Sequence, residues 1–309
     1  MAGFEKGFLK NASALQQIFI LISAVIFGMI IGQYLFIGFA YVKNGSSISD
    51  LNEFILHINE NAQLLRQSFF FQTLCAFFLP ALILSWLFSD DIRQYLRTEQ
   101  GFSGMVMMLT VLSIVFLMPF LNAVIYWTQQ IPFPDSLKVI ESRIAQWEEQ
   151  ARQTTEMILT TDKYLTFLTN LLIIAVFVAV GEEFLFRGVL QNIFSKVFKN
   201  PHAVIWTVGI IFSFIHFQFY GFFARAFLGV YLGYLLYYSK SIWVPVLAHF
   251  TQNAIGVIGF YSIRDPELLE KIDQVGVGST SWTALLSLVL FSTTFFLLIR
   301  KCKSQDFLS

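Results

Sequence analysis

GEEFLFRG, residues 181–188, is the stretch of sequence that decides how this chain folds. It places Glu182, Glu183 and Arg187 inside an apolar run that extends from about 164 to 190. A charged side chain near the bilayer centre costs about 2.5–3.5 kcal/mol on insertion scales, so such residues are rare in spans and face one another or a wet cavity. We therefore expect a membrane span whose charged side chains mark a functional site.

The composition of the whole chain agrees with a membrane protein. Of its 309 residues, 56% are hydrophobic and 13% are charged, whereas a soluble domain has about 25% charged residues. Because the net charge is zero, a nucleic-acid partner has no electrostatic support. A span needs about 20 mostly apolar residues, so we predict an all-α polytopic helix bundle of about eight spans in the lipid bilayer. The candidate spans lie at about 15–42, 68–88, 104–127, 164–190, 203–219, 222–238, 242–261 and 281–299.

The longer loops are predicted to contain amphipathic helices. In residues 128–163, apolar residues recur at helical spacing beside charged ones, which indicates a helix at the membrane surface or against the bundle. The stripe consists of Leu137, Ile140, Ile144, Trp147 and Ala151. Residues 43–67 show a weaker pattern of the same kind. Both segments are expected to be solvated caps on the bundle, and a role in gating the substrate is the alternative.

The chain divides into three parts by this pattern, and its loops predict its orientation. Residues 1–160 contain the first spans and the amphipathic loop helix, 161–262 a core with the charged residues, and 263–309 the last span and a polar tail. Lys and Arg occur in similar numbers on the two sides, but the segments on the side of the termini are shorter. The density of Lys and Arg is therefore higher on that side, which predicts that both termini are cytoplasmic and that the protein lies in the plasma (inner) membrane.

Helical spacing predicts which charged groups pair. Glu183 and Arg187 are four residues apart, so they share a helix face and can form an ion pair. Glu182 points about 100° away from Glu183 on a helix of 3.6 residues per turn. One carboxylate is thus neutralised, while that of Glu182 stays free for chemistry.

Two further spans bring polar residues to a similar depth. His249 and Asn253 share a face of one span, and His216 lies one turn after Phe212 in another. At about 1.5 Å per residue, Glu182, His216 and His249 all fall about 10–20 Å from the face that carries the termini. We therefore expect the site residues to converge in one cavity.

The residue types in this cavity suit hydrolysis. A Glu can take a proton from water, and a neighbouring His can orient that water. A second His and an Asn amide can donate hydrogen bonds to a developing oxyanion. Alternatively, Glu182, His216 and His249 could hold Zn²⁺ with one position open for water. An HExxH pair, typical of zincins, is absent from the sequence.

The same residues carry a resemblance to a known family. Over roughly residues 160–260, the order and spacing of three motifs resemble those of the CPBP family, also called the Abi or type II CAAX prenyl endopeptidase family. The motifs are EExxxR (Glu182, Glu183, Arg187), FxxxH (Phe212, His216) and HxxxN (His249, Asn253).

The resemblance implies specific roles for these residues. Glu182 and His216 would activate the water, and His249 and Asn253 would stabilise the oxyanion. Glu183, Arg187 and Phe212 would be supporting residues. Because the family has been described both as metalloproteases and as glutamate-dependent proteases, the resemblance leaves Zn²⁺ open, and we favour a glutamate-type enzyme without a cofactor.

The function we predict is endoproteolysis of a membrane-associated protein or peptide, such as CAAX-type processing or peptide maturation. The substrate would enter a cavity open toward the cytoplasm or laterally to lipid. One alternative is a proton-coupled transporter that uses the same buried Glu and His residues as a relay. Another is a catalytically silent scaffold or immunity protein. Arg225, near the end of the span at 222–238, is expected to extend its guanidinium away from the apolar interior toward the interface.

Overall fold

The computed structural model describes residues 5–43, 58–263 and 265–306, and the regular secondary structure among these residues is helical. The helices are α1 (Ala14–Lys43), η2 (Ile58–Glu60), α3 (Ala62–Thr73), η3 (Leu74–Phe78), α4 (Leu79–Phe88), α5 (Ile92–Leu96), α6 (Gly104–Gln129), η4 (Asp135–Leu137), α7 (Lys138–Leu159), α8 (Tyr164–Asn170), η5 (Leu171–Phe177), α9 (Val178–Glu183), η6 (Phe184–Leu190), α10 (Gln191–Ser195), α11 (Pro201–Phe214), α12 (Phe222–Ser239), α13 (Trp243–Ser262), α14 (Pro266–Asp273), η7 (Gly278–Thr280) and α15 (Ser281–Asp306). The prediction of an all-α bundle is confirmed.

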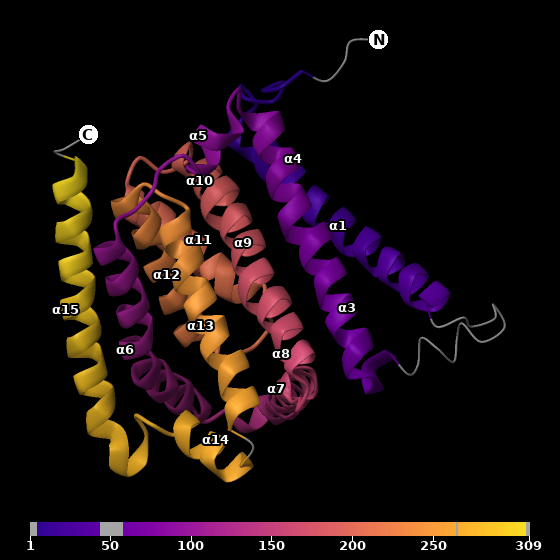
Figure 1. The fold of residues 1–309 in the computed structure, drawn as a ribbon, viewed down its shortest axis with the longest axis vertical. Coiled ribbons are helices and arrows are strands. Elements are labelled where there is room, and N and C mark those ends of the chain that lie inside the picture. The colour runs from indigo at the N-terminus through magenta and orange to yellow at the C-terminus, as the bar shows by residue number, and fades with distance from the viewer. Residues whose placement is uncertain (1–4, 44–57, 264, 307–309) are drawn as a thin grey trace.

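The bundle has two distinct ends (Figure 1). The beginning of α1, the end of α15 and the short helices α5 and α10 lie at one end. Helices α7, α8 and α14 lie at the other end. This arrangement gives a reference for the position of the cavity.

Each of the eight predicted apolar segments coincides with a helix or a continuous series of helices. Within the described residues, five of these are long and apolar enough to cross a membrane by length and composition. They are Ala14–Lys43, Ala62–Phe88, Gly104–Gln129, Tyr164–Ser195 and Gly278–Ser304. The other three predicted segments correspond to α11, α12 and α13, but α11 ends at Phe214, so His216 lies just after the helix that was predicted to contain it.

Helices α11 and α12 form a hairpin, in which α12 is largely buried and α11 has an exposed face with Trp206, Ile210 and Phe214. With 14 residues, α11 is about 21 Å long at 1.5 Å per residue, which is shorter than the hydrocarbon core of about 30 Å. The connection at residues 215–221 contacts α7, because the backbone N–H of Tyr220 donates to Glu148 Oε1 at 2.9 Å, while Phe217 is exposed. Irregular backbone at membrane depth is tolerated where protein covers it or where it lines a cavity.

Two helices that contribute little to the site are held by close backbone contact. In α1, Gly28 packs against Cys75 of η3, and Gly32 packs against Phe71 of α3 and Cys75. A Cβ added at Gly28 would come within 1.9 Å of the Cys75 carbonyl oxygen. Small residues let membrane helices approach closely, so these glycines fix the position of α1.

A polar cluster holds the end of α7 in place. Arg66 of α3 donates to the Ile158 carbonyl oxygen through Nε at 3.0 Å and Nη2 at 2.7 Å. Its Nε also donates to Asn170 Oδ1 at 2.8 Å, and Asn170 Nδ2 donates to the same Ile158 carbonyl at 2.9 Å. The C-terminal carbonyl of α7 is therefore satisfied by α3 and α8 together.

The predicted amphipathic helix is present as α7, but only one end of it is buried. Ile158 and Leu159 are buried, whereas Ile140 and Trp147 of the predicted stripe are 52% and 61% exposed. An exposed apolar face at one end of a membrane bundle suits an interfacial helix. The weaker pattern at 43–67 falls largely on residues 44–57, outside the described residues.

The glycine contact yields a matched test of the packing of α1. We expect Gly28→Ala to lower the free energy of unfolding of the purified protein in detergent by about 1–3 kcal/mol, because the new methyl group overlaps backbone atoms. Gly38, in the same helix, has no neighbouring atom within 4 Å of an added Cβ. Gly38→Ala should therefore leave stability unchanged or raise it, since Ala favours a helix by about 0.5–1 kcal/mol over Gly. Equal losses in the two variants would contradict this packing.

Candidate active site

A buried ion pair lies at the centre of the site. Arg187 Nη1 donates to Glu183 Oε1 at 3.0 Å, and both side chains are fully shielded from solvent. Arg187 Nη2 donates to the Gly229 carbonyl oxygen of α12 at 2.9 Å. The pair that helical spacing predicted is therefore present, and it also ties η6 to α12.

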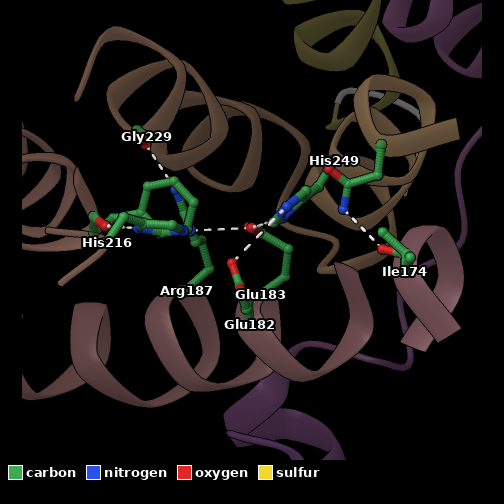
Figure 2. Close-up of polar contacts among 9 residues, drawn as sticks. Ile174, Glu182, Glu183, Arg187, His216, Gly229 and His249 are labelled. Atoms are coloured by element: carbon green, nitrogen blue, oxygen red, sulfur yellow. Dashed lines mark hydrogen bonds and ion pairs between the residues drawn. The ribbon is translucent and has the colours of Figure 1, made fainter. Parts of the chain in front are cut away.

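The same carboxylate holds His249. His249 Nδ1 lies 2.9 Å from Glu183 Oε1, so Glu183 lies between Arg187 and His249 (Figure 2). Because a carboxylate paired with Arg187 only accepts hydrogen bonds, Nδ1 carries the proton and donates. His249 Nε2 is then directed toward Glu182 and lies 3.9 Å from Glu182 Oε2. The sequence did not reveal this contact, since Glu183 and His249 are far apart in the chain.

Glu182 is buried but has an unsatisfied oxygen. The residue is 8% exposed, and its Oε2 has no hydrogen-bond partner among the described residues. A buried polar atom without a partner is costly and calls for an explanation, such as an unplaced water or a catalytic role. Glu183 also has an oxygen without a partner, Oε2, but its Oε1 accepts two hydrogen bonds.

His216 follows the last turn of α11 and is held by its own helix. Its Nδ1 lies 2.7 Å from the Phe212 carbonyl oxygen, so Nδ1 donates and Nε2 is left as an acceptor in the neutral ring. Phe217, the next residue, has a φ of 51°, an uncommon left-handed conformation for a bulky residue. The chain therefore turns sharply at His216.

The Phe212 ring connects the parts of the site. Its centroid lies 5.0 Å from that of His216 and 6.0 Å from that of His249. The Arg187 guanidinium carbon lies 4.7 Å from the same ring centroid, within the range of a cation–π contact. The ring thus orders both imidazoles and the guanidinium without taking part in proton transfer.

Asn253 makes a contact that limits its role. Its Nδ2 donates to the Ile174 carbonyl oxygen at 3.0 Å. Ile174 lies in η5, a π-helical stretch, where the altered hydrogen-bond register leaves backbone groups that a neighbouring helix can satisfy. One N–H of the amide is occupied in this way, which leaves the second N–H for a ligand.

One cavity brings the four predicted catalytic residues together. Glu182, His216, His249 and Asn253 all line a cavity of about 430 Å³. The rest of its lining comes from α3, α6, α7, α9, η5, α11, α12 and α13. Its volume falls within the usual range for ligand pockets, about 300–1,000 Å³.

The cavity extends away from the termini. Its α6 residues, Met118 to Ile125, lie in the second half of that helix, and Ile158 and Leu159 of α7 also line it. Both segments lie toward the end of the bundle that carries α7 and α14 (Figure 1). In the opposite direction, η6 is a fully buried segment of the apolar core. We expected an opening toward the cytoplasm or laterally to lipid, and which of these the cavity has stays a prediction.

Arg225 was assigned the wrong environment from the sequence. It lines the cavity instead of extending to the interface, and its Nη2 donates to Gln218 Oε1. The position of Arg225 near a helix end does not reveal which way its side chain points. That depends on the packing of α12, whose first turn lines the cavity.

A zinc site with three protein ligands is not assembled in this conformation. Glu182 Oε2 and His249 Nε2 are close enough to share an ion, and each imidazole donates its Nδ1–H as metal-binding histidines do. However, no group of three His, Cys, Asp or Glu side chains among the described residues is arranged to hold a metal ion. The present positions of the three candidate ligands therefore do not fit Zn²⁺.

The cluster contains charges of both signs. Glu182 and Glu183 supply two negative charges, and Arg187 supplies one positive charge. Arg225, which lines the same cavity and interacts electrostatically with Glu182, supplies a second positive charge. Buried charges are tolerated when they are balanced and hydrogen-bonded, and the arrangement places a carboxylate and an imidazole side by side at the cavity.

Comparison with known proteins supports the family resemblance. Residues 164–255 match the model of the type II CAAX prenyl endopeptidase Rce1-like family, and this segment includes all three motifs. The uncharacterized protein YpbD of Bacillus subtilis (strain 168) is 28% identical over 92 residues, which cover 28% of this chain and 44% of that protein. The chain thus spans less than half the length of this curated relative. No solved structure matches the chain.

The different partners of the two carboxylates predict different effects on stability. We expect Glu183→Gln to lower the free energy of unfolding by about 3–5 kcal/mol, because it leaves the buried Arg187 charge uncompensated. Glu182→Gln should change it by less than about 1 kcal/mol, because Glu182 Oε2 has no partner to lose. Thermal unfolding of the two purified variants in the same detergent measures the difference. A larger loss for Glu182→Gln would contradict the assignment of Glu183 as the structural carboxylate.

Proposed function

We propose that this chain is an intramembrane endopeptidase that hydrolyses a peptide bond in a membrane-associated protein or peptide. The family match over residues 164–255 supports this class of activity. The observation that carries the proposal is the buried Glu182 carboxylate, whose unpartnered Oε2 faces His249 at a cavity that His216 also lines. A basic group with an open acceptor beside space for a substrate is what general-base catalysis requires.

In the proposed reaction, Glu182 takes a proton from a water molecule that His216 orients through Nε2. The oxygen of this water attacks the peptide carbonyl carbon and forms a tetrahedral oxyanion. The carbonyl is restored when the C–N bond breaks, and the leaving nitrogen receives the proton held by Glu182. Water has then been added across the peptide bond, and Glu182 is again a carboxylate.

His249 and Asn253 are proposed to stabilise the oxyanion. Because His249 Nδ1–H is held by Glu183, Nε2 can donate only when the ring is an imidazolium. Glu183 favours this form, as a carboxylate does when it orients a catalytic imidazole. Asn253 contributes the amide N–H that Ile174 does not occupy. Each such donor stabilises the transition state by about 3–4 kcal/mol in well-studied acyl transfer.

The central prediction concerns Glu182. We expect Glu182→Gln to reduce peptide hydrolysis by about 10²–10⁴-fold, because the amide has nearly the same volume but cannot accept the proton. The assay uses purified protein in liposomes with a fluorogenic peptide that carries an S-farnesyl cysteine four residues from its C-terminus. A second assay compares the termini of membrane proteins in cells that express the wild type or the variant.

The controls for this prediction separate mechanism from damage. His202, which hydrogen-bonds Tyr234 outside the cavity, provides the matched variant His202→Gln, which should keep activity. Normal turnover by folded Glu182→Gln would overturn the assignment. We also propose that the enzyme needs no metal, so activity should survive chelation. Loss on chelation, with recovery on adding stoichiometric zinc alone, would make His216 and His249 ligands.

We further propose that both termini are cytoplasmic in the plasma (inner) membrane, as the Lys and Arg density favours. Since α7 lies at the other end of the bundle (Figure 1), it would then be at the outer face. The cavity would extend outward, which favours substrates that reach it from the outer face or through the lipid. The reverse orientation would favour substrates that arrive from the cytoplasm.

Cysteine labelling in intact cells tests this orientation. A membrane-impermeant maleimide should label Trp147→Cys on the exposed face of α7 and should not label Ser304→Cys near the end of α15 until the cells are permeabilised. The native Cys75 and Cys302 are buried, so they provide a low background. The opposite pattern would reverse the orientation, and labelling of both sites from one side would contradict the arrangement of the two ends.

A further inference from the structure

The first turn of α12 places positive charge at the cavity. The proposed mechanism does not use this charge. Gly221, Ala224, Arg225 and Leu228 follow one another at helical spacing, and all four line the cavity. The helix begins at Phe222 and has no side-chain cap at its N-terminus. A helix N-terminus has a positive electrostatic potential, and Arg225 adds a full positive charge to the same turn.

The Arg225 guanidinium keeps a donor that its surroundings do not satisfy. Its Nη2 donates to Gln218 Oε1, but Nη1 is buried without a hydrogen-bond partner among the described residues. Gly221 leaves room for the group, since an added Cβ there would lie 3.0 Å from Nη2 and 3.2 Å from Nη1. The guanidinium is thus held in place from one side with a free donor at the cavity.

The acidic residues nearby do not provide an equivalent partner. Glu148 of α7 and Glu182 both act on Arg225 electrostatically. However, Glu148 Oε1 accepts from the Tyr220 backbone, and Glu182 is directed toward His249. A buried charge is stabilised when it is paired and hydrogen-bonded, so the remaining donor suits an anion that enters with the substrate.

We propose that Arg225 binds a carboxylate of the substrate peptide, and so selects peptides that carry a carboxylate within a few residues of the bond that is cut. This inference rests on the proposed peptidase function. A guanidinium recognises a carboxylate through two parallel hydrogen bonds. Because Glu182 and Arg225 line the same cavity of about 430 Å³, the carboxylate and the reacting carbonyl are separated by only a short piece of peptide. The carboxylate comes either from the C-terminus or from an acidic side chain.

Three peptides, each with the S-farnesyl cysteine and identical except at the C-terminal residue or group, test this site and identify the source of the carboxylate. One ends in a free carboxylate, the second in a carboxamide, and the third in a carboxamide with Asp as its last residue. We expect the wild type to prefer the free carboxylate over the carboxamide by about 10–100-fold in kcat/KM, mostly through KM, as is typical of a hydrogen bond to a charged group. Recovery with Asp identifies any nearby carboxylate as sufficient, and no recovery identifies the terminal carboxylate.

Variants separate binding by Arg225 from a structural role. Arg225→Gln should lose the preference by slowing only the cleavage of peptides with the carboxylate, and Arg225→Lys should retain part of it. Glu148→Gln, which alters the contact between α7 and the hairpin, should keep the preference. Equal cleavage of the free acid and the carboxamide by the wild type, or an equal loss on all peptides in Arg225→Gln, would overturn the proposal.

Binding separates this inference from the proposed function. The affinity of the Glu182→Gln protein for fluorescent forms of the same peptides can be measured without cleavage. If the wild type cleaves none of the peptides but Glu182→Gln binds the free acid more tightly than the carboxamide, and Arg225→Gln removes that difference, the carboxylate site stands and the peptidase proposal fails. Equal affinities for the acid and the carboxamide would refute the carboxylate site whether or not cleavage occurs.

Discussion

The hydrogen bonds of the buried Glu183 carboxylate are the interaction on which the rest of the site depends. One oxygen accepts from Arg187 and from His249, so it connects the end of α9 to η6 and α13. Arg187 extends the connection to α12 through the Gly229 carbonyl. Because all of these groups are buried, each charge needs its partner, and removal of one would leave the others uncompensated. The geometry of His249 beside Glu182 follows from this network.

Departures from regular α-helix flank the carboxylates of the site. The series from Tyr164 to Ser195 contains two π-helical stretches, η5 and η6, on either side of the carboxylates. Asn253 satisfies a carbonyl of η5, and η6 carries Arg187. The connection between α11 and α12 places His216 and the first turn of α12 at the cavity. Irregular backbone of this kind is stable in a membrane only where protein or a cavity satisfies its polar groups.

Helix α7 lines the cavity at one end of the bundle. Its buried end is held by Arg66 and lines the cavity, while the rest presents exposed apolar side chains. Glu148 links it to the hairpin. Away from the membrane, the pKa of Glu149 is lowered to about 2 by hydrogen bonds from Arg152 and Gln153, so the polar face of α7 stays charged. Helix α7 thus has one end at the cavity and exposed apolar side chains along the rest, a pattern that suits an interfacial helix.

The sequence by itself determined the all-α class, the positions of the apolar segments, and the pairing of Glu183 with Arg187. Local periodicity is sufficient for these, because helix faces and spans depend on residues a few positions apart. The tertiary structure decided that Glu183 also holds His249, that Arg225 faces the cavity, and that the cavity extends away from the termini. These features depend on how α9, α12 and α13 pack against one another, and contacts between segments tens of residues apart leave no periodic signal in a single sequence.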